Sequence, residues 1–227
     1  MILHIPAVLS PEQVRACRIQ LAQGPWLDGR VTAGEQSGLA KRNLQLAEDS
    51  PQAAAVGEAV LAALGASALF MSAALPRRVY PPLFNRYSEG MSFGDHIDNA
   101  IRVSPVTGAR YRTDLSATLF LSNPQDYDGG ELTFDDGLSR RSVKLAAGDL
   151  VLYPATTTHR VEPITRGERW ASFFWIESMV GEEGRRDLLH QFDRAVASAR
   201  ADLGDAHPAA IALVGVYHNL VRMWAQA

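Results

Sequence analysis

Two histidines and one aspartate in the middle of the chain have the types and spacing needed to bind a metal ion. His96 and Asp98 are separated by one residue. On a strand, residues i and i+2 point to the same face, so these side chains converge and offer an imidazole and a carboxylate. Ile97 between them points the other way. His159 lies far downstream, and an antiparallel barrel can return it to the neighbouring strand.

Two imidazoles and one carboxylate occupy one face of an octahedron and leave three positions open, as in non-haem Fe(II) oxygenases. A zinc site with three protein ligands and a water is the alternative. Arg169 begins an apolar run that ends at Ile176. A guanidinium inside an apolar barrel needs an anion, and a carboxylate is its geometric match. A dicarboxylate that chelates the metal and reaches Arg169 would fit, and 2-oxoglutarate has that shape.

Each of these features is ordinary by itself. A lone His-x-Asp is usually a surface pair, His159 alone fits a satisfied strand histidine, and Arg169 alone fits a surface residue. Their order along the chain, with Asp128-Gly-Gly130 and Ala147-Gly-Asp149 turns between them, favours a functional site.

The elements that must position these residues are short strands. Runs rich in β-forming residues alternate with turns from about residue 77 to 177, which predicts a double-sheet jelly roll. We therefore expect a mainly β fold with flanking helices: a double-stranded β-helix (jelly-roll) core plus a C-terminal helical hairpin. The expected strands are 79–87, 92–97, 115–121, 131–134, 142–145, 150–153, 158–161 and 169–176.

We expect the chain to fold into three structural regions. Residues 1–77 form an N-terminal α/β region packed on the barrel, 78–178 the core, and 179–227 a C-terminal helical region. Ser10-Pro11 and Ser50-Pro51 are helix starts, and a short strand is expected at 2–5. Gly65 is expected to end the second of these helices. Two amphipathic helices follow the barrel, one from about 186 to 203 that Gly204 ends, and one from about 208.

The composition narrows the class of protein. The 227 residues carry 25 acidic and 22 basic side chains, with a pI near 6.1, which argues against nucleic-acid binding. Cys17 is the single cysteine, so no intramolecular disulfide can form. No apolar run is long enough to span a membrane, and the start lacks the basic region of a signal peptide. We therefore expect a cytoplasmic protein without a membrane partner.

The chain resembles the Fe(II)- and 2-oxoglutarate-dependent dioxygenases of the prolyl 4-hydroxylase-like branch, and more closely the bacterial PKHD-type hydroxylases, which are associated with iron uptake. The C-terminal helices agree with this resemblance. The matching stretches, which cover most of residues 78–178, are Phe84-Asn-Arg-Tyr-Ser-Glu-Gly90, His96-Ile-Asp-Asn99, Asp128-Gly-Gly-Glu-Leu132, Ala147-Gly-Asp-Leu-Val-Leu-Tyr-Pro154 and His159-Arg-Val-Glu-Pro-Ile-Thr-Arg-Gly-Glu-Arg169.

The resemblance implies that His96, Asp98 and His159 are iron ligands. It implies that Arg169 pairs with the distal carboxylate of 2-oxoglutarate and that Tyr87 also reaches it. The implied reaction hydroxylates a substrate while 2-oxoglutarate becomes succinate and CO2, with L-ascorbate helping to keep the iron reduced. The substrate, a small molecule or a peptide, is not identified. A cupin-like zinc or manganese enzyme without oxygen chemistry and a non-catalytic ligand sensor are the alternatives.

Two further expectations concern flexible or exposed parts. Residues 99–114 follow the His-x-Asp and lack a clear period, so they form either a lid over the metal or a solvated loop. Arg102, Arg110 and Arg112 on this segment would then meet an anionic substrate. The apolar surface of the C-terminal helices, at Phe192, Tyr217 and Trp224, suggests a homodimer.

Overall fold

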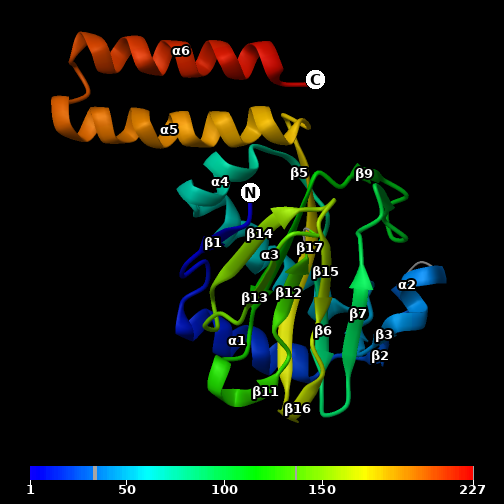
Figure 1. The fold of residues 1–227 in the computed structure, drawn as a ribbon. Coiled ribbons are helices and arrows are strands. Elements are labelled where there is room, and N and C mark those ends of the chain that lie inside the picture. The colour runs from blue at the N-terminus through cyan, green and yellow to red at the C-terminus, as the bar shows by residue number, and fades with distance from the viewer. Residues whose placement is uncertain (33–34, 136, 227) are drawn as a thin grey trace.

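Two antiparallel sheets face each other and form the core of the molecule (Figure 1). The computed structural model describes the backbone of residues 1–32, 35–135 and 137–226, and their side chains except for 31–37. The large sheet has the strand order β1-β14-β10-β17-β6-β4-β2, with β5 beside β17. Its strands are β1 (Leu3–Ile5), β2 (Trp26–Asp28), β4 (Leu44–Leu46), β5 (Pro76–Val79), β6 (Leu83–Tyr87), β10 (Leu115–Phe120), β14 (Leu150–Pro154) and β17 (Arg169–Ser178).

The smaller sheet has the order β13-β12-β15-β7-β3, and two separate hairpin-like pairs complete the β structure, so the jelly-roll expectation is confirmed. These pairs are β8 with β9 and β11 with β16. The bounds are β3 (Lys41–Arg42), β7 (Ser92–His96), β8 (Ile101–Val103), β9 (Arg110–Arg112), β11 (Tyr127–Gly129), β12 (Leu132–Asp135), β13 (Arg140–Val143), β15 (Thr158–Val161) and β16 (Ile164–Gly167).

Three helices cover the outer face of the large sheet: α1 (Pro11–Ala22), α3 (Pro51–Ala66) and α4 (Ala68–Ala74). Short helical turns lie at η1 (Gly29–Thr32), α2 (Glu35–Ala40) and η2 (Pro124–Asp126). Ser10 and Ser50 cap α1 and α3 as expected. Along β17 the side chains alternate: Trp170 and Phe174 pack under the helices, whereas Arg169 and Phe173 face the space between the sheets.

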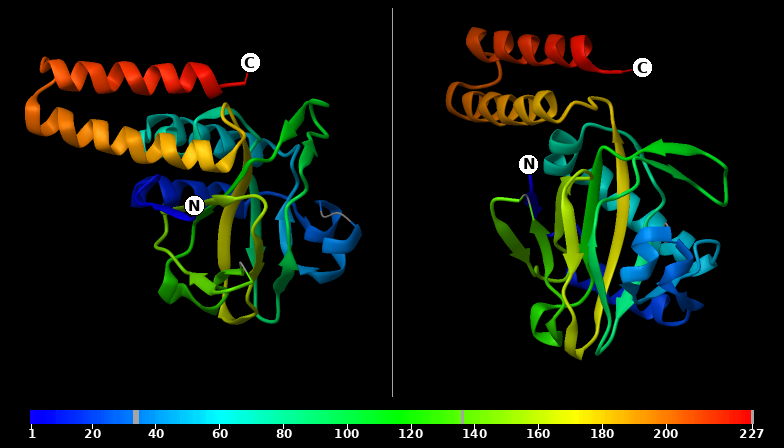
Figure 2. Two further views of the ribbon diagram at one scale, coloured as in Figure 1. Left: turned by 45° about the horizontal axis from the view of Figure 1, so that its top comes forward. Right: turned by 45° about the vertical axis from the view of Figure 1, so that its right-hand side comes forward.

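Helices α5 (Glu183–Leu203) and α6 (Pro208–Trp224) lie side by side at one end of the sheets, with α5 next to α4 (Figures 1 and 2). Gly204 ends α5 with a φ of 88°. Tyr217 and Trp224 are partly buried within this chain, in a cluster with Leu189. The surface expected for a dimer is therefore smaller than the sequence suggests, and the dimer itself stays a prediction.

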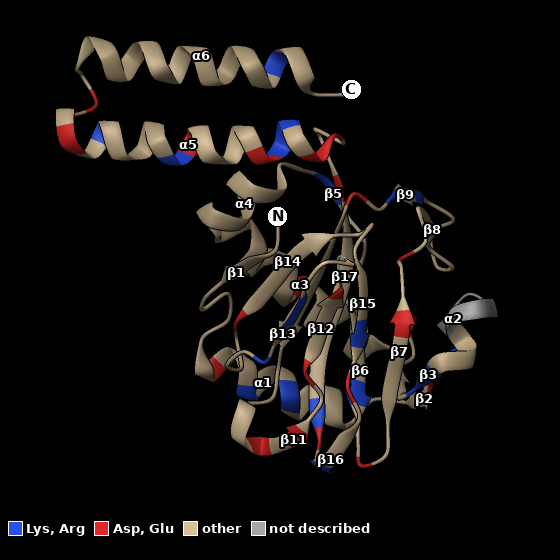
Figure 3. Cartoon of the chain, in the orientation of Figure 1, with Lys and Arg blue, Asp and Glu red and all other residues tan. Residues whose placement is uncertain are grey.

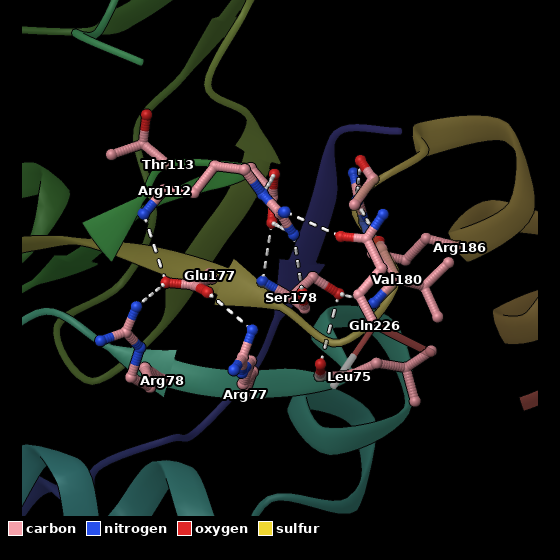
Figure 4. Close-up of polar contacts among 12 residues, drawn as sticks. Leu75, Arg77, Arg78, Arg112, Thr113, Glu177, Ser178, Val180, Arg186 and Gln226 are labelled. Carbon is pink, nitrogen blue, oxygen red and sulfur yellow. Dashed lines mark hydrogen bonds and ion pairs between the residues drawn. The ribbon is translucent and has the colours of Figure 1, made fainter. Parts of the chain in front are cut away.

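A polar network ties the C-terminal region to the end of β17 (Figure 4). The carboxylate of Glu177 is buried and accepts from Arg78 at 2.5 Å and from Arg77 at 3.4 Å. Arg112 in β9 donates to Asp114 and to the amide oxygen of Gln226, near the end of the chain. The C-terminal region, the large sheet and the β8–β9 hairpin are thereby joined at one place.

Several boundaries differ from the expectations. The strand expected at 79–87 is divided into β5 and β6, because Pro81 and Pro82 cannot donate ladder hydrogen bonds. Gly65 does not end α3: the helix continues to Ala66, and Ser67 is its C-cap. Residues 101–112 form a paired hairpin rather than an irregular loop. No single helix in the described ranges is long and apolar enough to cross a membrane; α3 and α4 together pass by length and composition, but bend by 85°.

Candidate metal centre

His96, Asp98 and His159 come together between the two sheets. Strands β7 and β15 are neighbours, and His96 and His159 are directly opposite each other in the register. Their ring centroids are 4.2 Å apart, and Asp98 follows the end of β7. The Nε2 atom of His159 lies 3.9 Å from Oδ2 of Asp98, and one ligand atom from each of the three residues lies within 4.8 Å of the others. The arrangement can hold one metal ion with three protein ligands.

Each imidazole is oriented by the backbone carbonyl group of the residue two positions before it in the chain. Nδ1 of His96 lies 2.8 Å from the carbonyl oxygen of Gly94, and Nδ1 of His159 lies 2.9 Å from that of Thr157. A proton on Nδ1 of each ring satisfies these contacts and leaves both Nε2 lone pairs for a metal. The Asp98 carboxylate is held in turn by the hydroxyl of Ser116, which donates to Oδ2 at 2.5 Å.

The electrostatics of the site keep His96 in the form that binds metal. Burial, together with the neighbouring His159, lowers the pKa of His96 to about 4. The ring is therefore neutral near pH 7, and a metal does not have to displace a proton from it.

Arg169 lines the same pocket, and its charge has no carboxylate partner among the residues that the structure describes. Its side chain is 1% exposed, and its Nε atom has no hydrogen-bond partner. Within the described chain no carboxylate lies within ion-pair distance of it; the guanidinium instead lies over the rings of Tyr87 and Phe120, at 5.5 and 5.1 Å. A buried guanidinium without an acidic partner is costly, so this end of the pocket is built to receive an anion.

Tyr87 is the register partner of Arg169 across β6 and β17 and lines the same pocket. Burial raises the pKa of its hydroxyl to about 12, so the group keeps its proton and can donate to an anion. The turn Asp128-Gly-Gly130 makes room for this end of the pocket. Gly130 has a φ of 68°, and a Cβ there would lie 2.3 Å from Ile164 and 3.2 Å from Cδ of Arg169.

The structure also brings to the pocket residues that the sequence reasoning missed. Two of them are Ser116 and Thr118. The sequence held a signal for this pair, because polar residues two apart in the otherwise apolar strand β10 share one face of the strand. Tyr153 is buried with its hydroxyl 3.4 Å from Nε2 of His159, and burial raises its pKa. No local signal marks Lys41. The remaining polar lining residues that were missed are Asn85 and Asn99.

The three arginines expected to meet a substrate separate into different places. Arg102 lines the pocket. Arg112 is turned away and is held by Asp114, Ser178 and Gln226, and Arg110 is exposed and does not line it. The expectation is therefore wrong for Arg112, because its guanidinium is used to join the hairpin to the C-terminal region.

The fold and the donor set define a 2-oxoglutarate- and Fe(II)-dependent oxygenase. The 2OG-Fe(II) oxygenase superfamily model matches residues 82–177, and the model of the PKHD-type hydroxylase C-terminal domain matches 183–226. A PKHD-type hydroxylase of Gluconobacter oxydans is 58% identical over 226 residues, and one of Methylobacterium nodulans is 54% identical, each covering 100% of both chains. The chain belongs to the PKHD-type hydroxylases.

Solved structures share the core fold at low sequence identity. A Pseudomonas putida prolyl-4-hydroxylase is 21% identical with a TM-score of 0.53, and covers 78% of this chain and 92% of its own. A Trichoplax adhaerens prolyl hydroxylase is 15% identical with a TM-score of 0.54, and covers 82% of this chain and 86% of its own. These likenesses support the jelly-roll core.

Proposed function

We propose that this protein holds Fe(II) with His96, Asp98 and His159, holds the distal carboxylate of 2-oxoglutarate with Arg169 and Tyr87, and hydroxylates an organic substrate. The observation that carries the proposal is the buried guanidinium of Arg169, which has no acidic partner among the described residues and lines the pocket of the three candidate ligands. One carboxylate among the ligands leaves Fe(II) with residual positive charge, which favours a dianionic co-substrate.

Iron and 2-oxoglutarate, when bound, supply the oxidising chemistry, in which O2 and 2-oxoglutarate are consumed and succinate and CO2 are released. The protein's own residues position and shield this chemistry. Ser116 fixes the Asp98 carboxylate, and the carbonyl groups of Gly94 and Thr157 fix both imidazoles. The rings of Tyr87 and Phe120 exclude water from the guanidinium of Arg169, which strengthens its attraction for a carboxylate.

An anaerobic titration tests the proposal. Fe(II) and 2-oxoglutarate together should give a visible absorption band with the wild-type protein. In Arg169→Met the concentration of 2-oxoglutarate needed should rise about 100-fold, because a buried charge-assisted pair is lost. Arg166→Met, which breaks an exposed ion pair with Asp128, is the matched control and should leave the titration unchanged.

The same titration separates the alternatives. A zinc or manganese enzyme without oxygen chemistry would give no band and no succinate in air. A ligand sensor would give the band but no succinate. Absence of the band from the wild-type protein would refute the proposed function.

Three finer proposals rest on the resemblance and on the sequence. We propose a link to iron uptake, which requires that synthesis of the protein rise in iron-limited cells. L-ascorbate is proposed to prolong turnover, measured as succinate formed per enzyme. A cytoplasmic location is proposed from the sequence and is tested by cell fractionation.

We also propose the homodimer through the C-terminal helices. Figure 3 shows that α6 carries almost no charge, in contrast to α5. Its exposed apolar residues are Ile211, Val216 and Met223. A monomer by light scattering at micromolar concentration would contradict this proposal.

A further inference from the structure

A tyrosine hydroxyl lies beside the candidate metal ligands, and the proposed function gives it no role. Tyr153, in β14, lines the pocket and is only 4% exposed. Its hydroxyl oxygen lies 3.4 Å from Nε2 of His159, and the two rings meet edge to face with their centroids 5.0 Å apart. Buried hydroxyl groups in proteins keep a hydrogen-bond partner, so the partner of this one matters.

The other hydrogen bond of His159 decides the direction of this contact. Nδ1 lies 2.9 Å from the carbonyl oxygen of Thr157, which can only accept, so the proton of the neutral ring is on Nδ1. Nε2 is then an acceptor, and Tyr153 is the donor. At 3.4 Å the contact is long for a hydrogen bond and is therefore weak.

Metal binding removes this acceptor. Nε2 is the atom that His159 offers to a metal, and its single lone pair cannot serve the metal and the Tyr153 hydroxyl together. An atom 3.4 Å from Nε2 lies beside the position that a metal would take, so the hydroxyl faces whatever else the metal binds. Leaving a buried donor unpaired costs free energy, so the loaded site favours a new acceptor for this proton.

The surroundings of Tyr153 connect the metal ligands with the residues around Arg169. Tyr153 belongs to the same apolar cluster as Tyr87 and Phe120, whose rings lie against the guanidinium of Arg169. The hydroxyl of Thr118, also in the pocket lining, interacts with the Tyr153 hydroxyl and can donate to it, which keeps the Tyr153 proton available for another acceptor. Tyr153 therefore joins the two regions that a bound 2-oxoglutarate would span.

We propose that, when the metal is bound, the hydroxyl of Tyr153 donates to an oxygen atom at the keto-acid end of 2-oxoglutarate. The keto and carboxylate oxygens of that end are all acceptors, and they lie at the metal beside His159. Tyr153 thereby orients the co-substrate at the metal, while Arg169 and Tyr87 hold its distal carboxylate. This inference rests on the proposed function, because it adds a residue to the binding of the same co-substrate.

Tyr153→Phe removes one oxygen atom and keeps the ring that packs against Phe134, so its effects on metal and on co-substrate can be compared. Fe(II) alone, titrated without oxygen in competition with a chelator, should bind the variant at least as tightly as the wild-type protein, because the metal no longer displaces a hydrogen bond from Nε2. At saturating Fe(II), the 2-oxoglutarate concentration that gives half of the visible band should rise about tenfold, as expected when one hydrogen bond to a charged group is lost. The band maximum should also shift, because the transition involves the keto-acid group.

Tyr80→Phe is the matched control for removal of a buried hydroxyl. Tyr80 is 1% exposed, donates to Glu48 at 3.2 Å and lies outside the set of residues that line the pocket. This variant should change neither titration and should not move the band. Circular dichroism verifies that both variants fold.

Weaker binding of Fe(II) alone by Tyr153→Phe would assign the hydroxyl to support of the metal ligands, and unchanged binding of 2-oxoglutarate would leave it without a ligand. Either result overturns the inference. Weaker binding of 2-oxoglutarate with an unmoved band would place the hydroxyl at the distal carboxylate, which overturns it as well. Absence of the band from the wild-type protein would instead be a failure of the proposed function.

Discussion

The two ends of the pocket are built in different ways. The inner end lies on long, fully paired strands: Arg169 belongs to β17, which has β10 on one side and β6 on the other. The outer end lies on short elements, because Lys41 is on the two-residue strand β3 and Arg102 on a separate two-stranded hairpin. Deeply paired strands hold side chains rigidly, whereas short surface elements tolerate change. The comparison teaches that Arg169 is held by the rigid part of the pocket, whereas Lys41 and Arg102 lie on its more adaptable part.

The largest effect is expected when a candidate metal ligand, which lies between the two ends of the pocket, is removed. His159→Ala should abolish Fe(II) binding and lower succinate formation by more than about 1000-fold, because only two protein ligands remain. Metal content after dialysis and succinate formation measure the two effects. His218→Ala removes an exposed histidine on α6 and should change neither. Retention of iron by the His159 variant would contradict the proposed ligand set.

A second prediction concerns the rigidity of the inner end. Gly130→Ala places a methyl group against Ile164 and Arg169 at a positive φ, and should lower the free energy of unfolding by about 2 kcal/mol and weaken 2-oxoglutarate binding. Gly137→Ala is the control, since its φ is 82° and nothing lies within 4 Å of the added Cβ. It should share the cost of backbone strain but leave 2-oxoglutarate binding unchanged. Denaturant unfolding and the anaerobic titration measure both effects.

A third prediction concerns the stability cost of the buried Lys41 charge at the outer end. The pKa of Lys41 is lowered from 10.5 to about 8, so between these pH values the unfolded chain binds more protons than the folded one. Stability contributed by this group therefore rises with pH across that window, and below pH 8 the buried charge costs the folded state its full amount. Lys41→Met should raise the free energy of unfolding by about 2 kcal/mol at pH 7.

That gain should shrink as the pH rises above 8, because the lysine of the wild-type protein then loses its charge. Denaturant unfolding of both proteins at pH 7 and pH 9.5 measures the difference, with Arg166→Met as the reference for an exposed cation. A gain that is equal at both pH values would mean that packing, not charge, separates the two proteins. Such a result would contradict the view that burial of the Lys41 charge lowers the stability of the folded protein.

Much of the architecture could be predicted from local rules. Ser10 and Ser50 cap helices because their hydroxyls satisfy free backbone N–H groups, and Gly204 ends a helix because it adopts a positive φ. The same local logic failed at Gly65, where the helix continues for one more residue and Ser67 serves as the cap of both α3 and α4. A glycine permits a helix end, but the packing of the following segment decides where it falls.

The sequence by itself determined which residue types meet in the pocket: His96 and Asp98 are two residues apart, although β7 ends at His96 and does not include Asp98, and an arginine in an apolar run demands an anion. Only the tertiary structure decided which polar residues surround these groups and which charged residues line the outer end of the pocket. Lys41 and Arg102 come from opposite sides of β7 in the chain, and no local pattern relates them. Their charges act together because the sheets and the hairpin enclose one small volume of low polarity, where the distance between two groups in space, not in sequence, sets their interaction energy.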